Sequence, residues 1–231
     1  CTLGIQRKAA GIKSVERKIA EYAFEHGLVK PIVNKNRTGK KVCVVGSGPA
    51  ALAAAQQLNR FGHDVTVLEK MNKIGGLLRY GIPDFKLPKE ILDRRISQLE
   101  QEGITFKTKT IVGAIKELEH GVHNDSLTEV RGEQLLKDYD AIVLAPGSES
   151  PRDLKLPGRS LSGIYFALDF LIAQNRENNG DCPNPIDVKG KNVVVIGGGE
   201  TASDCIGVSI RKGAASVVQL DYHDELPESV D

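Results

Sequence analysis

The sequence has few of the large side chains that usually fill a protein core. Among its 231 residues there is no tryptophan and a single methionine, and aromatic residues make up 5%. Aliphatic residues must therefore supply most of the core. With 40% hydrophobic and 26% charged residues, the composition is still that of a globular protein.

Long apolar runs and an excess of one charge are also missing. The longest runs, such as Val42 to Val45 and Val193 to Ile196, fall far short of the roughly 20 residues of a membrane-spanning helix. Lysine and arginine number 31 against 30 aspartates and glutamates, with a net charge of +1. We therefore expect neither a membrane nor a nucleic acid among the partners.

Cysteine is scarce and widely spaced. The four cysteines, Cys1, Cys43, Cys182 and Cys205, include no C-x-x-C pair, so we predict no disulfide framework and a reducing, cytoplasmic setting. The opening residues carry neither a start methionine nor the apolar region of a signal peptide. We accordingly expect a piece of a longer protein.

Strand and helix patterns alternate from about Lys41 onward, which is typical of parallel α/β architecture. Before that point, residues 14–26 have helical periodicity, with Ser14 as a candidate N-cap and Gly27 as a stop. Residues 34–40 are polar and predict a linker. We expect a helical N-terminal segment over residues 1–38, a first domain over 39–160 and a second over 161–231.

Two segments of the chain resemble each other. Residues 41–69 and 191–221 each contain an apolar strand, a G-x-G-x-x-A turn, a helix that ends at glycine, a second strand and a final acid. This order of elements predicts two Rossmann-like βαβ units that bind dinucleotides. A lone glycine turn also occurs for purely structural reasons, but the complete series favours nucleotide binding.

In the first unit, Gly46 permits a tight turn, Gly48 lets the backbone approach a pyrophosphate, and Ala51 keeps the helix near the sheet. The helix N-terminus would then face the phosphates. Glu69 stands a little more than about 20 residues beyond the turn, where an acid binds ribose hydroxyls. We predict that role for Glu69.

In the second unit, Gly197, Gly199 and Ala202 occupy the same positions, and Asp221 is the corresponding acid. A carboxylate there accepts hydrogen bonds from the ribose of NADH but repels the 2′-phosphate of NADPH. No arginine follows at Tyr222 or His223, so NADH is the predicted cofactor. The alternative is that Asp221 merely ends a strand at the surface.

Between the two units, residues 139–147 read YDAIVLAPG. This is an apolar strand that ends at Gly147, where backbone could approach a cofactor. Its place between two dinucleotide units is typical of disulfide-reductase-like flavoproteins, although Pro146 replaces the threonine usual in their A-T-G motif. Taken alone, the strand is ordinary core.

Three further motifs point to a particular family, and the first of them is much more specific than either glycine turn. They are GGLLRYGIPDFKLPK at residues 75–89, Pro151-Arg152-Asp153, and Gly198-Gly199-Glu200-Thr201-Ala202. With them, essentially the whole chain resembles the small (beta) subunit of glutamate synthase, within the broader group of pyridine nucleotide-dependent flavoproteins. In that family the first unit binds FAD and the second binds NAD(P)H.

The resemblance assigns roles by matching motif. It implies that Gly48, Pro49, Ala50, Ala51 and Leu52 hold the FAD pyrophosphate, Glu69 and Lys70 the adenosine ribose, and Gly76, Leu77 and Lys86 other parts of the flavin. It implies that Gly198, Gly199, Glu200, Thr201 and Ala202 hold the nicotinamide cofactor. Read from the residues alone, the favoured interpretation is that Lys86 is a solvated charge before a helix opened by Pro88, and that Gly75-Gly76 is a simple turn.

The resemblance also implies an iron–sulfur cluster in a full-length parent, with Cys1 as the last cysteine of a ligand group whose other members lie upstream. One thiolate cannot hold such a cluster. The family further implies that both dinucleotide domains are incomplete within these residues. No redox-active cysteine pair is present for a disulfide reductase.

The function implied is that of an electron-input flavoprotein. It would oxidise NAD(P)H and pass electrons through FAD and iron–sulfur clusters to a large glutamate synthase subunit or domain, which makes glutamate from glutamine and 2-oxoglutarate. Hydride chemistry belongs to the cofactors, so no acid–base residue is named. The alternatives are another FAD oxidoreductase subunit, of the ferredoxin or dihydropyrimidine dehydrogenase kind, and a non-catalytic nucleotide-binding fragment.

Overall fold

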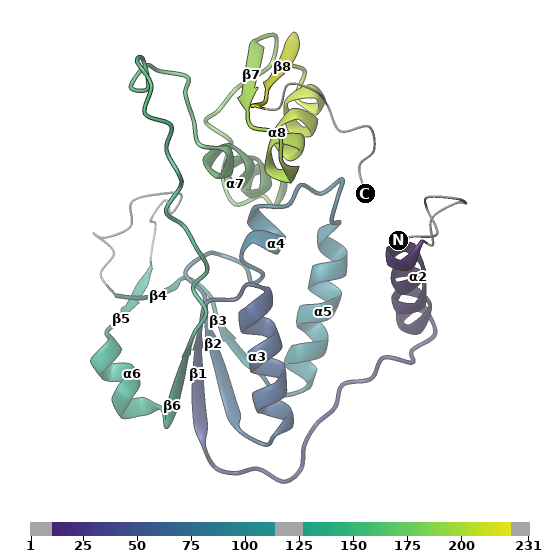
Figure 1. Ribbon diagram of the computed structural model, residues 1–231. Coiled ribbons are helices and arrows are strands. Elements are labelled where there is room, and N and C mark those ends of the chain that lie inside the picture. The colour runs from purple at the N-terminus through teal and green to yellow at the C-terminus, as the bar shows by residue number, and fades with distance from the viewer. Residues whose placement is uncertain (1–10, 114–126, 223–231) are drawn as a thin grey trace.

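Four parallel strands form the centre of the first unit in the computed structural model, which describes residues 11–113 and 127–222. The strands are β1 (Lys41–Val45), β2 (Asp64–Leu68), β3 (Thr105–Lys107) and β6 (Ala141–Leu144), in the order β3-β2-β1-β6. Val42 lies opposite Val65 on one side and Ala141 on the other. The carboxyl ends of the strands point toward the second unit (Figure 1).

Helices α3 (Pro49–Arg60) and α5 (Lys89–Gln101) cover one face of this sheet, and the short α4 (Leu77–Tyr80) lies at its carboxyl end (Figure 1). Near the other face lie α6 (Gly132–Asp138) and a parallel pair of short strands, β4 (Thr110–Val112) and β5 (Thr128–Val130). The core is aliphatic: Val44, Val67, Ala51, Ala55 and Leu99 are fully buried.

A buried carboxylate joins α3 to the end of α5. Glu102 is inaccessible to solvent and accepts hydrogen bonds from Gln56, Arg60 and Gln98. Burial on its own raises the pKa of Glu102, but these hydrogen bonds together outweigh that effect, and the pKa is lowered. The ionised carboxylate is thus the form that the fold stabilises.

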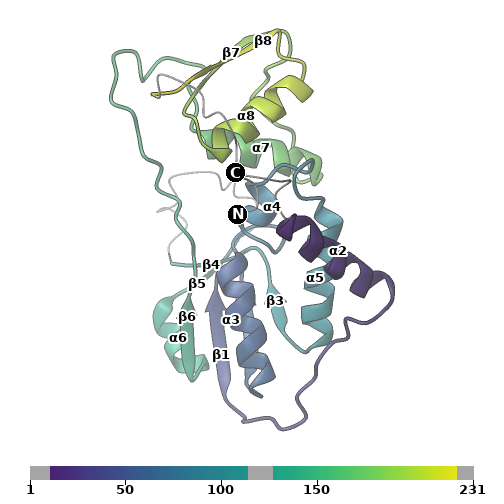
Figure 2. The ribbon, with the colours of Figure 1, turned by 45° about the vertical axis from the view of Figure 1, so that its right-hand side comes forward.

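The second unit repeats the arrangement on a smaller scale. Strands β7 (Asn192–Ile196) and β8 (Ser216–Leu220) pair in parallel, and α8 (Glu200–Arg211) connects them. Helix α7 (Ala167–Asn178) packs beside α8 (Figure 2). Leu171, Val188, Cys205 and Val208 belong to a core separate from that of the first unit.

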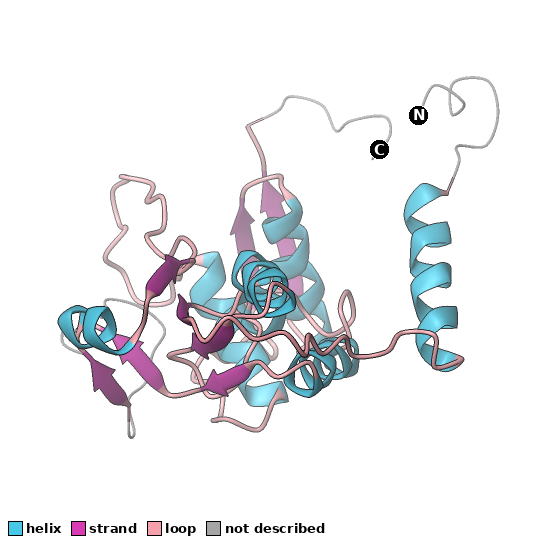
Figure 3. Ribbon diagram, turned by 90° about the horizontal axis from the view of Figure 1, so that it is seen from below, coloured by secondary structure: helices cyan, strands magenta, loops and turns pink. Residues whose placement is uncertain are grey.

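Helix α2 (Ile12–Glu25) lies apart from both sheets (Figure 3). Glu21 accepts two hydrogen bonds of 3.0 Å from Arg94 of α5. Gly27 follows the helix with φ +63°, as a stop requires. The prediction for Ser14 is wrong: Gly11 is the N-cap, and the Ser14 hydroxyl instead donates to the Gly11 carbonyl at 2.7 Å.

The predicted α/β fold with two Rossmann-like units is confirmed. The domain boundaries predicted between residues 38 and 39 and between residues 160 and 161 stay predictions. Within residues 11–113 and 127–222, no helix has both the length and the apolar character needed to cross a bilayer. Cys1 and His223 lie outside the described residues.

Candidate functional site

The first glycine turn follows β1 directly. Gly46 has φ +99°, and a Cβ atom there would stand 2.2 Å from the Ala145 carbonyl oxygen. Its N–H donates to the Leu68 carbonyl at 2.8 Å. Glycine is required at this position because the chain after β6 occupies the space of a side chain.

Gly48 has a different surrounding. It is the N-cap of α3, with φ −67° and ψ −178°, and no side chain caps the helix. Apart from Gly48 and its chain neighbours, no protein atom lies within 4 Å of the position that a Cβ would take. The backbone here is open from outside, with the first-turn N–H groups and the positive end of the helix dipole behind it.

The remaining predicted residues of α3 divide between surface and core. Pro49 and Ala50 are exposed in the first turn, whereas Ala51 and Leu52 are buried at 0% and 6% exposure. The small Ala51 side chain belongs to the core cluster shared with β1 and β2. This agrees with the prediction that alanine keeps the helix close to the sheet.

Glu69 reaches back to the first turn from the end of β2. It is 5% exposed, accepts a short hydrogen bond from the Ser47 hydroxyl, and accepts another from the Met71 N–H at 2.8 Å. The same Ser47 oxygen accepts the Gly75 N–H at 2.9 Å. Ser47 therefore connects Glu69 to the Gly75-Gly76 turn, a role that its place as a variable residue in the motif did not reveal.

Gly76 lies directly against the first turn. With φ +53°, it is so close that an added Cβ would stand 2.9 Å from the Gly48 Cα. Leu77 follows as the first residue of α4 and is 45% exposed. The structure thus brings Gly48, Gly76 and Leu77 together at one end of the sheet.

Lys70 and Gly147 lie at the periphery of this group. Lys70 forms a short ion pair with Glu149, in the segment that follows β6. Gly147 has φ +77° and open space where a side chain would stand. The loop after β6 is therefore held next to the end of β2 by one charge pair.

The second glycine turn matches the first closely. Gly197 N–H donates to the Leu220 carbonyl at 2.8 Å, as Gly46 does to Leu68. Gly199 is the N-cap of α8, with φ −84° and ψ −178°, and the space around its Cβ position is again empty. Thr201 is exposed beside it, and Ala202 is buried at 7%.

The acid of each unit meets the middle residue of its own turn. Asp221 lies so close to Gly198 that a Cβ there would be 1.8 Å from the Asp221 Oδ2. In the first unit the equivalent middle residue is Ser47, which donates to Glu69. Both acids predicted from spacing therefore come to the turn they were assigned to.

Lys86 lies at α8. Its ammonium is 2.7 Å from Glu200 and 2.6 Å from Asp204. The hydrogen bond that the Lys86 ammonium donates to Asp204, followed by the one that it donates to Glu200, raises the pKa of Lys86, and the lysine lowers the pKa of Glu200. The pairing offsets the negative charge that Glu200 brings to a helix N-terminus. Sequence reasoning missed Asp204 because nothing in the motif marks it.

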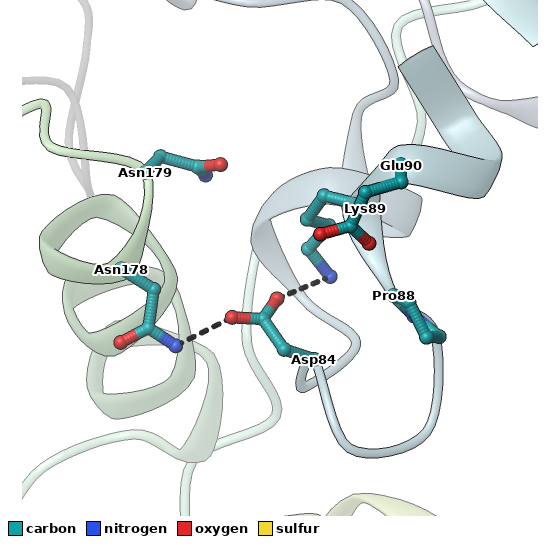
Figure 4. Close-up of a pocket in the computed structure, with 6 residues that line it drawn as sticks. All are labelled: Asp84, Pro88, Lys89, Glu90, Asn178 and Asn179. Atoms are coloured by element: carbon teal, nitrogen blue, oxygen red, sulfur yellow. Dashed lines mark hydrogen bonds and ion pairs between the residues drawn. The ribbon is translucent and has the colours of Figure 1, made fainter. Parts of the chain in front are cut away.

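The described residues hold no group of three or more metal-ligating side chains. A polar cavity of about 220 Å³ lies between the start of α5 and the end of α7, away from both glycine turns. Asp84 is one of the residues that line it, and its carboxylate accepts a hydrogen bond from Asn178 at 2.8 Å and pairs with Lys89 at 3.2 Å (Figure 4). None of the predicted site residues lines this cavity.

The open N-caps of α3 and α8 show whether each turn has room for a dinucleotide. Gly48 and Gly199 each leave bare backbone at a helix N-terminus, and an acid stands at each turn. A pyrophosphate needs the first feature and a ribose needs the second. The residues present therefore fit two dinucleotides, one in each unit.

The sequence matches the pyridine nucleotide-disulphide oxidoreductase family over residues 40–231. The chain belongs to this family. The predictions of an oxidoreductase that uses FAD and a nicotinamide dinucleotide are confirmed at this level.

The resemblance to glutamate synthase small subunits is also confirmed. The chain is 44% identical over 230 residues to the glutamate synthase [NADPH] small chain of Bacillus subtilis, covering 98% of this chain and 44% of that protein. It is 46% identical over 224 residues to the glutamate synthase [NADH] of Schizosaccharomyces pombe, covering 96% of this chain and 10% of that protein. The chain thus spans less than half of either relative.

A solved structure shares the arrangement. FprA from Mycobacterium tuberculosis in complex with NADPH superposes with a TM-score of 0.59 and 26% identity. The match covers 78% of this chain and 43% of that one. It extends over more of the chain than one βαβ unit.

Proposed function

We propose that the protein is the electron-input flavoprotein of a glutamate synthase. It would oxidise NAD(P)H, pass electrons through FAD and iron–sulfur clusters, and deliver them to a large subunit or domain that forms glutamate from glutamine and 2-oxoglutarate. The names of the relatives support this assignment, since they include both a small chain and a much longer glutamate synthase. The observation that carries it is the pair of open glycine turns, each facing its own acid.

In this proposal the first unit holds FAD. The N–H groups behind Gly48 face the pyrophosphate, and Glu69 and Lys70 face the adenosine ribose. Gly76 and Leu77 border the flavin, because they lie next to Gly48 at the end of the sheet. Bound FAD supplies the hydride-accepting and single-electron chemistry that no side chain can provide.

The second unit holds the nicotinamide dinucleotide. Residues 197–202 receive its pyrophosphate at the N-terminus of α8, and Asp221 receives the ribose hydroxyls. The positive charge of Lys86 offsets the negative charge of Glu200, so that the anionic ligand is repelled less.

We further propose a preference for NADH. Asp221 lies against Gly198, and the next residue, Tyr222, offers no positive charge to a 2′-phosphate. Two like charges about 4 Å apart repel by roughly 4 kcal/mol at an effective dielectric of 20, before screening by salt. A remainder of about 1.4 kcal/mol is enough for tenfold discrimination.

The proposal is tested by purification of the full-length protein from its native host. We expect bound FAD, an iron–sulfur cluster and a copurifying amidotransferase subunit. Recovery of a different redox partner would transfer the assignment to another FAD oxidoreductase. Protein without any flavin would leave only a nucleotide-binding module.

A further inference from the structure

The segment of residues 80–86, which we name the docking segment, leaves the first unit and contacts the second. The Tyr80 hydroxyl donates to Asp181 at 3.1 Å, and the Tyr80 carbonyl accepts from Asn175 of α7 at 2.9 Å. Tyr80 is 2% exposed although it belongs to the short α4. These two hydrogen bonds fix the start of the segment against the second unit.

The end of the docking segment lies along a single stripe of α8. Glu200, Asp204, Gly207 and Arg211 are spaced by four, three and four residues, so they lie on one face of the helix. Lys86 pairs with the two carboxylates. The Phe85 ring contacts the other two residues of this stripe, Gly207 and Arg211.

The Phe85 ring lies against the bare backbone of Gly207. A Cβ at Gly207 would stand 2.6 Å from the ring Cζ, and the Arg211 guanidinium carbon is 3.8 Å from the ring centroid. Arg211 also donates to the Gly207 carbonyl at 2.9 Å. Gly207 lies in mid-helix, where glycine costs about 1 kcal/mol relative to alanine. Contact with the Phe85 ring gives this glycine a packing reason.

Through this contact, the docking segment and α8 connect the first glycine turn to the second. The docking segment begins four residues after Gly76, which lies against Gly48. The stripe that receives it begins at Glu200, next to the N-cap Gly199. A shift of Phe85 along α8 would therefore displace one turn relative to the other.

We propose that Phe85 is a positioning residue: its packing on Gly207 and Arg211 fixes the position of the nicotinamide unit for hydride transfer to the flavin. The inference rests on the proposed function. Phe85 touches neither reacting atom in this account. It acts by holding α8, because hydride transfer depends steeply on the approach of the two rings.

The test is anaerobic stopped-flow reduction of the FAD-loaded full-length protein by saturating NADH and, separately, NADPH. For Phe85→Ala we expect normal FAD content and a rate of flavin reduction lower by about 10- to 100-fold. Phe85→Tyr, which keeps the ring, should retain the wild-type rate. Phe61→Ala, which removes another exposed ring at the C-cap of α3, is the matched control and should leave the rate unchanged.

Gly207→Leu tests the contact from the other side. Leucine is a better helix former than glycine, so α8 should stay folded while its side chain displaces Phe85. We expect a similar fall in rate, and no further fall when Phe85→Ala is added. This variant also decides the matter if Phe85→Ala does not retain FAD, because the first unit is unchanged in it.

The results distinguish a failure of the positioning role from a failure of the proposed function. Wild-type reduction rates in folded, FAD-loaded Phe85→Ala and Gly207→Leu proteins would overturn the positioning role and leave the proposed function intact. Absence of flavin reduction in the wild-type protein with either nucleotide would overturn both.

Discussion

Replacing Gly48 with valine should impair ligand binding more than folding, because this glycine leaves room for a ligand and is not required by the backbone. The Gly48 dihedral angles, φ −67° and ψ −178°, are ones that valine adopts readily. Apart from the residue itself and its chain neighbours, no protein atom lies within 4 Å of the new Cβ. The main structural cost is a poorer N-cap, about 1 kcal/mol, against a typical total stability of about 5–15 kcal/mol.

The effect on FAD should be much larger. A branched side chain over Gly48 blocks the approach of a pyrophosphate to the N–H groups of α3. Loss of two charge-assisted hydrogen bonds, at about 1.5–3 kcal/mol each, weakens binding by at least about 3 kcal/mol, or more than 100-fold. The measurements are flavin absorbance per mole of protein and the dissociation constant of added FAD, beside a thermal unfolding curve.

Two matched variants sharpen this prediction. Gly199→Val has the same geometry in the second unit and should retain FAD while it loses NADH binding. Gly46→Val should fail to fold, since φ is +99° and the Ala145 carbonyl oxygen occupies the side-chain position. Full FAD content in folded Gly48→Val protein would show that the pyrophosphate does not approach this turn.

Three further predictions concern charge and reactivity. Asp221→Ser should shift the kcat/KM ratio of the full-length protein toward NADPH by about tenfold, and an unchanged ratio would mean that the ribose lies elsewhere. Because the pKa of Glu102 is lowered in the folded state, its contribution to stability is present above about pH 4.3 and is lost as the pH falls through the folded value. Urea unfolding from pH 6 to pH 3 should therefore show that the free energy of unfolding falls less steeply with decreasing pH in Glu102→Gln than in the wild-type protein. An equally steep fall in the variant would contradict the role given to Glu102. Burial raises the pKa of the Cys43 and Cys205 thiols to about 11, so iodoacetamide at pH 8 should label the partly exposed Cys182 well before either of them, as peptide mass mapping would reveal.

The sequence predicted the two units because each carries its own local pattern. Apolar strands, glycine turns and helices repeat in order, and the acids at 69 and 221 stand at equivalent distances from their turns. Such features depend on contacts within one βαβ unit. The structure brings Glu69 and Asp221 to the turns for the same reason.

What the sequence could not indicate depends on contacts between distant residues. The resemblance implies that Lys86 contacts the flavin, which stays a prediction, but it gives no sign that Lys86 pairs with Glu200 and Asp204, more than a hundred residues away. The packing of Phe85 on Gly207 is of the same kind. No periodicity or spacing within one element reports where a segment of another unit will lie.

Ser14 shows a limit of local reasoning. Serine before an apolar periodic run is a good N-cap candidate, yet the helix begins earlier, at Ile12. The Ser14 hydroxyl donates to a backbone carbonyl instead of accepting from a backbone N–H. Serine has both options, and sequence alone does not choose between them.

The proposed function depends on one step, the reduction of FAD in the first unit by NAD(P)H bound in the second. It is tested most directly by mixing the FAD-loaded full-length protein with NADH in the absence of oxygen and of any electron acceptor. We expect bleaching of the oxidised flavin spectrum, fast with NADH and slower with NADPH when either nucleotide is at limiting concentration. Flavin that stays oxidised with both nucleotides would contradict it.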